Sequence, residues 1–570
     1  MFNYIYRLLH PANIKKAIQI FSTSGFQGLS QRLRGRLQYK YSAWRRDYRK
    51  FRTKHQLSSV ELDRQRRFQF NHQPVFGVII PLYSTKESYL RELLESFKAQ
   101  TYSRFKLFLV DASPLLPESP NSEPSTALSA IVANYQDSVP INYVVLGRNL
   151  GISGNSNHGF KLALQDPSIT HIALCDHDDY VEPNTFFEYT KYLNQHSDAR
   201  IIYCDEDIVA FRDDPDAYYV VKPDFNRFLI ESCNYVNHFF VCDKTLLPVI
   251  RTSDGEYERS AFDGAQDYDL YLRLLPHATF HHIPKILYHW RAAENSTAKN
   301  PQNKTYAYEA GERTLTEYLQ AQSMVPASVS QPVLPGSYRV DYHLQSQPLV
   351  SIITQNPAKA HFIDGFKSDN YTNFEVVADV ALASPKSEIL FFLDNNLQPI
   401  SKHTIAQLVG ILQRNAVGCV AGQILNRRHR IEHAGLIVGI HHSVGNIFYD
   451  ESPVYTYNDH GALVGEYSAV SGSCLMVKKS TYHKFNGFDS SLGNLSDVDF
   501  CLRLRDAGLS VVYNPTASFK RLGKSSPKTA SPDIIAALRA AHPNIFAHGD
   551  PFYNPNLSLD HTDCRLMQSD

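Results

Sequence analysis

Features that would place a chain of this size in a simple class are missing. No run approaches the roughly 18 apolar residues that a membrane-spanning helix needs, and the first residues do not form a secretory signal with a cleavage site. The 8 cysteines form no CxxC pair and no regular framework, which argues against structural zinc and disulfides. The cysteines therefore predict reduced, buried thiols in a cytosolic protein.

What is present describes a large globular protein. The chain has 570 residues, of which 43% are hydrophobic, 20% charged and 12% aromatic. This length exceeds one ordinary hydrophobic core, so we expect two to four domains.

The charge is unevenly distributed, although the net charge is +0. The first 70 residues hold about 16 Lys and Arg against about 3 acidic residues. Residues 1–72 also carry an apolar helical stripe, including Leu29, Leu33 and Leu37, and are predicted to form a basic amphipathic helical region. Such a helix can lie on an anionic membrane surface, and the alternative is an arm packed on its own protein. We expect membrane contact, with a cytoplasmic location at the inner face of the cell membrane, and no nucleic-acid partner.

From Val75 onward, strand-like runs alternate with helical patterns. Apolar runs at 75–80, 105–110, 141–146 and 171–174 predict strands, and helical periodicity follows the first and the fourth. This alternation predicts a parallel α/β sheet, whose ligands bind at the carboxyl ends of the strands.

Acidic residues stand at two of those strand ends. Asp176, Asp178 and Asp179 follow the run His171–Leu174 directly. They form either a solvated turn or a site for Mg²⁺ or Mn²⁺, cations that also bind substrate phosphates. Asp111 ends the second strand, where a carboxylate can bond a ribose or a base, or cap a helix.

The order of these motifs resembles family 2 glycosyltransferases of the GT-A fold, in particular bacterial enzymes that build cell-surface polysaccharide. The resemblance covers about residues 74–320. Four segments in the first part of this range carry it: Val78-Ile79-Ile80-Pro81, Leu93–Tyr102, Leu109-Val110-Asp111 and Asp176-His177-Asp178-Asp179. Two segments in its later part complete the match, Asp263–Leu270 and Tyr288-His289-Trp290-Arg291.

The resemblance implies a role for each matching residue. It implies nucleotide binding by Pro81, Tyr83, Asp111, Asn149, Asp176 and Asp178. It implies that a divalent cation, Mn²⁺ or Mg²⁺, is held by Asp176, Asp178 and the late histidine His289. It makes Asp267 the catalytic base, although the usual Glu-Asp pair reads Gln266-Asp267 here. Acceptor contacts would come from Asp205, Gln266 and Trp290, while Asp205 could equally belong to a solvated turn.

The chemistry of sugar transfer needs these residue types. A nucleotide-sugar has a diphosphate leaving group, whose developing charge a bound cation neutralises. The acceptor hydroxyl must lose its proton to a placed carboxylate. One base and one stabilised leaving group predict a single displacement, and therefore inversion at the anomeric carbon.

The second half repeats the first. A Pro-containing linker at 326–348 separates a catalytic GT-A domain at 73–325 from a second, degenerate GT-A-like domain at 349–545, followed by a tail at 546–570. The interval between the second and fourth strand patterns is short in this copy, so a nucleotide-cradling strand is missing. Its acidic motif reads Asp394-Asn395-Asn396, and Lys520-Arg521 stand near the place of the late histidine.

We therefore expect tandem GT-A domains in an inverting, metal-dependent glycosyltransferase. It would move a hexose or deoxyhexose from a UDP- or dTDP-linked donor to a growing cell-surface glycan, such as O-antigen or capsule, carried on a lipid. Two alternatives stay open: a non-catalytic carbohydrate-binding assembly protein with relic domains, and a nucleotidyltransferase. Donor hydrolysis with Mn²⁺ separates the first from the enzyme, and pyrophosphate release would identify the second.

Overall fold

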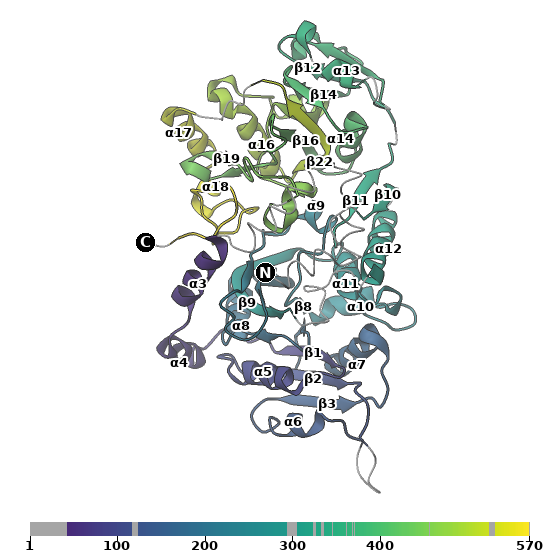
Figure 1. Ribbon diagram of the computed structural model, residues 1–570, viewed down its shortest axis with the longest axis vertical. Helices are drawn as coiled ribbons and strands as arrows, with labels where there is room; N and C mark the ends of the chain where they lie inside the picture. Colours follow the sequence, from purple (N-terminus) through teal and green to yellow (C-terminus); the bar gives the residue numbers. More distant parts are fainter. Residues whose placement is uncertain are drawn as a thin grey trace, which may run out of the picture.

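A computed structural model of the chain shows two α/β domains, joined side by side (Figure 1). It describes residues 43–116, 124–292, 305–322, 326–331, 336–344, 346–360, 362–366, 369, 371–454, 456–523 and 530–568. Residues 1–42, and with them most of the predicted basic arm, lie outside the described residues.

The first domain is built on a mixed sheet with the order β3-β2-β1-β4-β8-β6-β9-β5, and β7 pairs with β6. Strands β1 to β4 run parallel to one another, as the alternation predicts. The strands are β1 (Phe76–Leu82), β2 (Phe105–Asp111), β3 (Ile141–Val145), β4 (His171–Leu174), β5 (Tyr180–Val181), β6 (Ile201–Val209), β7 (Tyr218–Val220), β8 (Val241–Asp243) and β9 (Phe280–Arg291).

Helices cover this sheet because their apolar residues recur at helical spacing. In α5, Leu90, Leu93, Leu94 and Phe97 are all buried in the core. The first-domain helices are α5 (Glu87–Lys98), α6 (Ser129–Ala133), α7 (Gly151–Gln165), α8 (Thr185–Gln195), α9 (Arg227–Ile230), α10 (Leu247–Ile250), α11 (Gln266–Leu274) and α12 (Thr305–Ala321).

The second domain repeats the strand order of the first. Its sheet reads β13-β12-β14-β21-β16-β22-β15, which matches β2-β1-β4-β8-β6-β9-β5 strand for strand. Among the described residues, no strand of this sheet corresponds to β3. The strands are β12 (Val350–Ile353), β13 (Phe374–Val377), β14 (Ile389–Leu393), β15 (Leu397–Pro399), β16 (Val417–Leu425), β17 (Ile431–His433), β18 (Leu436–Val438), β19 (Val444–Asn446), β20 (Gly465–Glu466), β21 (Cys474–Lys478) and β22 (Ser510–Arg521).

The repeated strand order confirms the tandem GT-A-like fold, and within the described part of the second domain the sheet ends at β13. The helices of this domain are α13 (Phe362–Phe366), α14 (Thr404–Leu412), α15 (Lys479–Lys484), α16 (Ser496–Asp506), α17 (Pro532–Ala541) and α18 (Pro543–His548). The predicted linker contains an antiparallel pair, β10 (Pro326–Ser330) and β11 (Arg339–Tyr342).

The two domains are held together by buried polar contacts. Glu231, after α9, accepts two hydrogen bonds from the Arg414 guanidinium at 2.6 and 2.7 Å, and both side chains are buried. The Asn226 side chain donates to Glu466 O and accepts from Glu466 N. Paired, satisfied groups of this kind fix one orientation of the partners.

The described part of the basic region packs on its own protein. Helix α3 (Ala43–His55) buries Trp44 and Tyr48, whose hydroxyl donates to Asp207 in β6. Helix α4 (Ser59–Arg67) follows it. The apolar face of α3 is therefore not available to a membrane, which corrects the expectation for this part of residues 1–72.

The predicted tail is part of the interior. Asn554 donates to Asp205 and to the Lys222 carbonyl, and the Tyr219 hydroxyl donates to the Cys564 carbonyl. In Figure 1 the C-terminal segment lies at the junction of the two domains, beside α3. All 8 cysteines are free, as expected. Among the described residues, no helix is both long and apolar enough to cross a membrane.

Candidate active site

The carboxyl ends of the parallel strands bring four predicted residues to one edge of the first sheet. Tyr83 follows β1 and is 48% exposed, Asp111 ends β2, exposed Asn149 lies after β3, and Asp176 follows β4. The register pairs Leu82 with the end of β2 and Ile79 with Leu174, so these strand ends are neighbours. This is the edge where ligands of open α/β sheets bind.

Pro81 is buried inside β1, which continues to Leu82 instead of ending at the proline. A parallel pairing with Val110 accommodates it, because proline still supplies a carbonyl to the ladder. Its predicted contact with the nucleotide stays a prediction.

Asp111 is fully buried, and its carboxylate is engaged by its own chain. The Ser113 amide donates to Oδ1, while the hydroxyls of Thr126 and Tyr143 donate to Oδ2 at 2.5 and 2.6 Å. Burial and the bond to Asp111 raise the pKa of Tyr143 to about 12. A nucleotide that contacts Asp111 would have to replace one of these partners. On the neighbouring loop, Asn149 Oδ1 accepts from the Gly151 amide and from Asn155, which shapes the start of α7.

The three carboxylates after β4 have two different environments. Asp179 is fully buried, accepts from the Tyr288 hydroxyl at 2.5 Å and from the Arg291 amide at 2.7 Å, and so attaches the turn to β9. Burial and the neighbouring carboxylates raise the pKa of Asp179. The Asp176 side chain is 54% exposed, and Asp178 is partly buried. Within the described part of the chain, neither of these two carboxylates accepts a hydrogen bond.

This donor set suits a divalent cation shared with a substrate. Among the described residues, no three His, Cys, Asp or Glu side chains converge to form a complete metal cluster. Mg²⁺, however, is usually held by one or two carboxylates together with substrate phosphates and water. Asp176 and Asp178, whose carboxylates accept no hydrogen bond from the described residues, fit that mode of binding.

Asp267 is the second residue of α11, in the first turn of the helix, where the helix dipole favours a negative charge. Its Oδ2 accepts from Asn234 Nδ2 at 3.1 Å and from Asn237 Nδ2 at 2.5 Å. Oδ1 has no hydrogen-bond partner among the described residues. One oxygen is thus fixed and the other is left for an incoming hydroxyl. Asp263, just before α11, accepts hydrogen bonds from the amide and the hydroxyl of Ser153 at the start of α7.

Residues 234–238 connect the base to the acidic turn, and sequence reasoning missed them. Next to Asn237, the imidazole of His238 lies with Nε2 3.9 Å from Asp176 Oδ2, stacked on Tyr288 and tilted against Trp290. Glu206 contacts its Nδ1 at 3.1 Å. Although burial disfavours the charge, Glu206 and Asp176 raise the pKa of His238 to about 9. The signal available in the sequence was that Asn234, Asn237 and His238 are set among aromatic and aliphatic residues.

The structure does not bring His289 to the acidic turn. Side chains alternate along a strand, so His289 leaves β9 on the face opposite to Tyr288 and Trp290. Its Nδ1 lies 2.7 Å from Asp207 and its Nε2 3.1 Å from Glu182, and these carboxylates raise its pKa to about 10 against the effect of burial. Both nitrogens are taken, which corrects the expectation that His289 is a metal ligand. The histidine beside Asp176 is His238.

The predicted acceptor residues have different fates. Asp205 is fully buried in β6 and bonds Lys222, His282 and Asn554, so it belongs neither to an acceptor surface nor to a solvated turn. Partly buried Trp290 lies against His238, beside the acidic turn. Gln266 starts α11 and accepts from the Gly264 amide. Acceptor binding by Trp290 and Gln266 stays a prediction.

A further carboxyl group lies near Asp267. Glu258 is 3% exposed, and its Oε2 has no hydrogen-bond partner in the described part of the chain. Burial, opposed by a bond to Ser156 and reinforced by the charges of Asp267 and Asp176, raises the pKa of Glu258 to about 8. Asn157 holds the backbone of this residue through its side-chain amide.

Comparison with known proteins agrees with this geometry. The family model described as glycosyl transferase family 2 matches residues 77–246. An uncharacterized protein of Sinorhizobium fredii, y4gI, is 30% identical over 555 residues, covering 86% of this chain and 58% of that protein. The O-antigen biosynthesis protein RfbC of Myxococcus xanthus is 26% identical over 556 residues, covering 88% of this chain and 42% of that protein.

A shorter relative matches part of the chain. The amylovoran biosynthesis glycosyltransferase AmsE of Erwinia amylovora is 25% identical over 240 residues, which are 40% of this chain and 79% of that protein. The chain spans about half the length of y4gI and RfbC.

The parallel strands, the acidic turn at their ligand-binding edge and the carboxylate in the first turn of α11 form a domain of the GT-A type. The match to the glycosyl transferase family 2 model covers residues 77–246, and the relatives of the chain include proteins named for O-antigen and amylovoran biosynthesis.

Proposed function

We propose that the first domain transfers a sugar, with inversion, from a nucleotide-diphosphate donor to a growing cell-surface glycan. One observation carries this proposal: Asn237 bonds Asp267, and its neighbour His238 faces Asp176. Asp267, which is suited to act as base, and Asp176, which is suited to bind a cation, therefore lie on two sides of the loop 234–238.

Each group has a defined task. Asp176 and Asp178 would hold Mg²⁺ or Mn²⁺, which supplies charge neutralisation for the departing diphosphate. Asp267 removes the proton of the acceptor hydroxyl through its free Oδ1. Trp290 offers an aromatic face for a sugar ring next to the turn. UDP- and dTDP-linked hexoses or deoxyhexoses are the donors we propose, and a lipid-carried glycan is the acceptor class.

Contact with the cytoplasmic membrane surface is part of the proposal only for residues 1–42. Helix α3 is already docked on the protein, so the basic stretch that precedes it would supply the attraction to anionic lipid. Vesicle flotation of the full chain and of a variant starting at residue 43 tests this point.

The decisive experiment is nucleotide release from a panel of sugar nucleotides, with Mn²⁺, Mg²⁺ or EDTA. We expect cation-dependent release from one donor, and none from the Asp178→Ala variant. Manganese binding with UDP present, followed by the EPR signal of free Mn²⁺, gives a readout that does not depend on turnover. Release that persists in EDTA and in Asp178→Ala would contradict the cation assignment, and failure of every donor would contradict the proposed activity.

A further inference from the structure

The loop that carries Asn234, Asn237 and His238 has no regular secondary structure of its own, so something else must fix it. Asp267 orients the amide side chains of Asn234 and Asn237. An ionised carboxylate can only accept hydrogen bonds, so the Nδ2 groups must face it. This orientation leaves the Oδ1 atoms of Asn234 and Asn237 buried without partners in the described part of the chain. Unsatisfied buried oxygens cost stability, so the arrangement serves the orientation of Asp267 and not the fold.

Lys222 fixes this loop from behind. Its side chain is 2% exposed, and Nζ donates to the carbonyls of Val236 and Asn237 and contacts Glu206 at 3.2 Å. Glu206 in turn accepts from the amide of His238. A single ammonium group thus gathers the backbone of the loop that orients the base.

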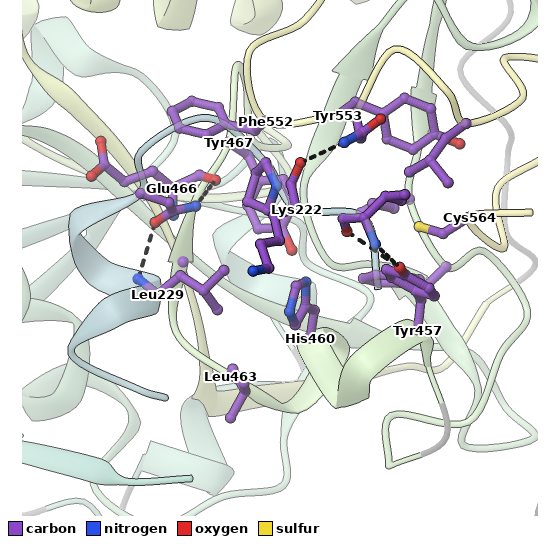
Figure 2. Close-up of a pocket in the computed structure, with 18 residues that line it drawn as sticks. Lys222, Leu229, Tyr457, His460, Leu463, Glu466, Tyr467, Phe552, Tyr553 and Cys564 are labelled. Carbon is purple, nitrogen blue, oxygen red and sulfur yellow. Dashed lines mark hydrogen bonds between the residues drawn. The ribbon is translucent and has the colours of Figure 1, made fainter. Parts of the chain in front are cut away.

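The C-terminal segment fixes Lys222. Asn554 Nδ2 donates to the Lys222 carbonyl and to Asp205 Oδ2, both at 2.9 Å. Asp205 Oδ1 accepts from the Lys222 amide at 2.8 Å. Figure 2 shows Lys222 at this junction, between Tyr553 of the C-terminal segment and His460 and Tyr457 of the second domain. These residues line a cavity of about 30 Å³. The junction is closely packed, so a displacement of one member is passed to the next.

We propose that Asn554 and Lys222 are positioning residues for the catalytic base, acting through Asn237, so that the C-terminal segment completes the active site of the first domain. This inference rests on the proposed function of Asp267. The proposal gives the degenerate second domain a role in catalysis without any chemistry of its own. This domain holds the C-terminal segment, and that segment holds the loop 234–238 through Lys222.

Two matched pairs of variants test the proposal, using the donor that the panel selects. Asn554→Ala should lower kcat about twofold to thirtyfold with little change in the KM of the donor. The control is Asn556→Ala in the same C-terminal segment. This variant loses a hydrogen bond to the Pro284 carbonyl, but the Asn556 side chain bonds neither Lys222 nor Asp205. It should keep the wild-type kcat.

At the loop, Asn237→Ala should lower kcat about tenfold to a hundredfold. Asn237→Asp should be worse than Asn237→Ala, because it keeps the shape but sets a carboxylate against Asp267. If Asn237 only filled space, Asn237→Asp would keep a higher kcat than Asn237→Ala. In the Asn237→Ala background, Asn554→Ala should have no further effect on kcat, since both act on the same group.

Hydrogen exchange of the unliganded full chain provides a test without turnover. Asn554→Ala should speed exchange of the amides in residues 234–238, and Asn556→Ala should not. If Asn554→Ala fails to fold, Asn554→Ser takes its place. Wild-type kcat in the Asn554 variant, additive effects in the double variant or unchanged exchange at 234–238 would each overturn the proposal. A wild-type chain without transfer activity would instead count against the proposed function and leave the exchange result valid.

Discussion

In the second domain, the Arg521 guanidinium lies 2.7 Å from Asp394 Oδ2 and also contacts Glu432 at 2.5 Å. Asp394 directly follows β14, as Asp176 stands just beyond β4. Arg521 in β22 pairs with Leu397 in β15, just as His289 in β9 pairs with Tyr180 in β5. The second acidic turn thus carries a cation of its own, supplied by an arginine side chain.

This ion pair predicts a single divalent-cation site per chain. Because Arg521 neutralises the carboxylate, Asp394→Asn should leave Mn²⁺ binding unchanged, whereas Asp178→Ala should abolish it. Titration of the Mn²⁺ EPR signal in the presence of UDP measures the number of sites. Two equivalent sites in the wild-type chain would show that Arg521 does not block the second turn.

The base assignment predicts a clear contrast between the two domains. Asp267→Asn keeps the shape but removes the proton acceptor, so transfer should fall by about a hundredfold to ten-thousandfold while donor binding stays. Asp497→Asn is the matched control, because Asp497 occupies the same place, the second residue of α16. It should leave transfer unchanged. Initial rates and calorimetric binding of UDP with Mn²⁺ measure the two effects. Loss of transfer only in the Asp497 variant would mean that the second domain is the active one.

Glu258 predicts a pH dependence of stability. Its pKa in the folded protein is about 8, above the value of 4.5 for an exposed glutamate, so the folded state binds more protons between these two values. Stability therefore falls as pH rises from about 4.5 to 8, and stays lower above that. Glu258→Gln removes this loss. Thermal melts in EDTA at pH 5 and pH 8.5 should show the variant gaining on the wild type by a few kcal/mol at the higher pH, an order-of-magnitude figure. A difference in Tm that does not grow with pH would contradict a neutral Glu258.

The Glu231–Arg414 pair predicts that the domains unfold together. Arg414→Ala leaves the buried Glu231 with only Arg227, 3.6 Å away, and the Tyr342 hydroxyl as partners, and loss of the closest charge of a buried pair costs about 3 to 5 kcal/mol. Arg414→Met with Glu231→Leu removes both charges and should cost much less. Denaturant unfolding, followed by fluorescence and circular dichroism, measures both. Equal losses in the single and the double variant would show that burial of the charge is not the cause.

Much of the fold could be predicted because its signals are local. The strands β1, β2, β3 and β4 are mostly apolar runs, and the repeat of this pattern after residue 349 predicts the second sheet. The shortened interval before Ile389 even indicated the missing strand. The predicted strand at 75–80 stops before Pro81 and Leu82, which the structure includes in β1, because proline ends a strand only where its missing N–H is needed.

The candidate site could be predicted in part. Asp176, Asp178 and Asp267 stand in motifs that can be read from the sequence. His238 could not be assigned, because its contact with Asp176 joins residues far apart in the chain and follows no periodicity. His289 was misassigned because its direction depends on the alternation along β9, where neighbours point to opposite faces. Asp205 could have belonged to a solvated turn, and only the folded chain shows its partners, which are Lys222, His282 and Asn554 of the C-terminal segment.

That packing also sets an order on biosynthesis. The partners of Asp205 and Tyr219 in the C-terminal segment, Asn554 and Cys564, leave the ribosome more than 300 residues after the strands they complete. Until then, Oδ2 of the buried Asp205 lacks the hydrogen bond from Asn554, although Oδ1 is already paired with Lys222 and His282. During cotranslational folding, the first domain therefore cannot complete these buried contacts until residues 554–564 have been synthesised.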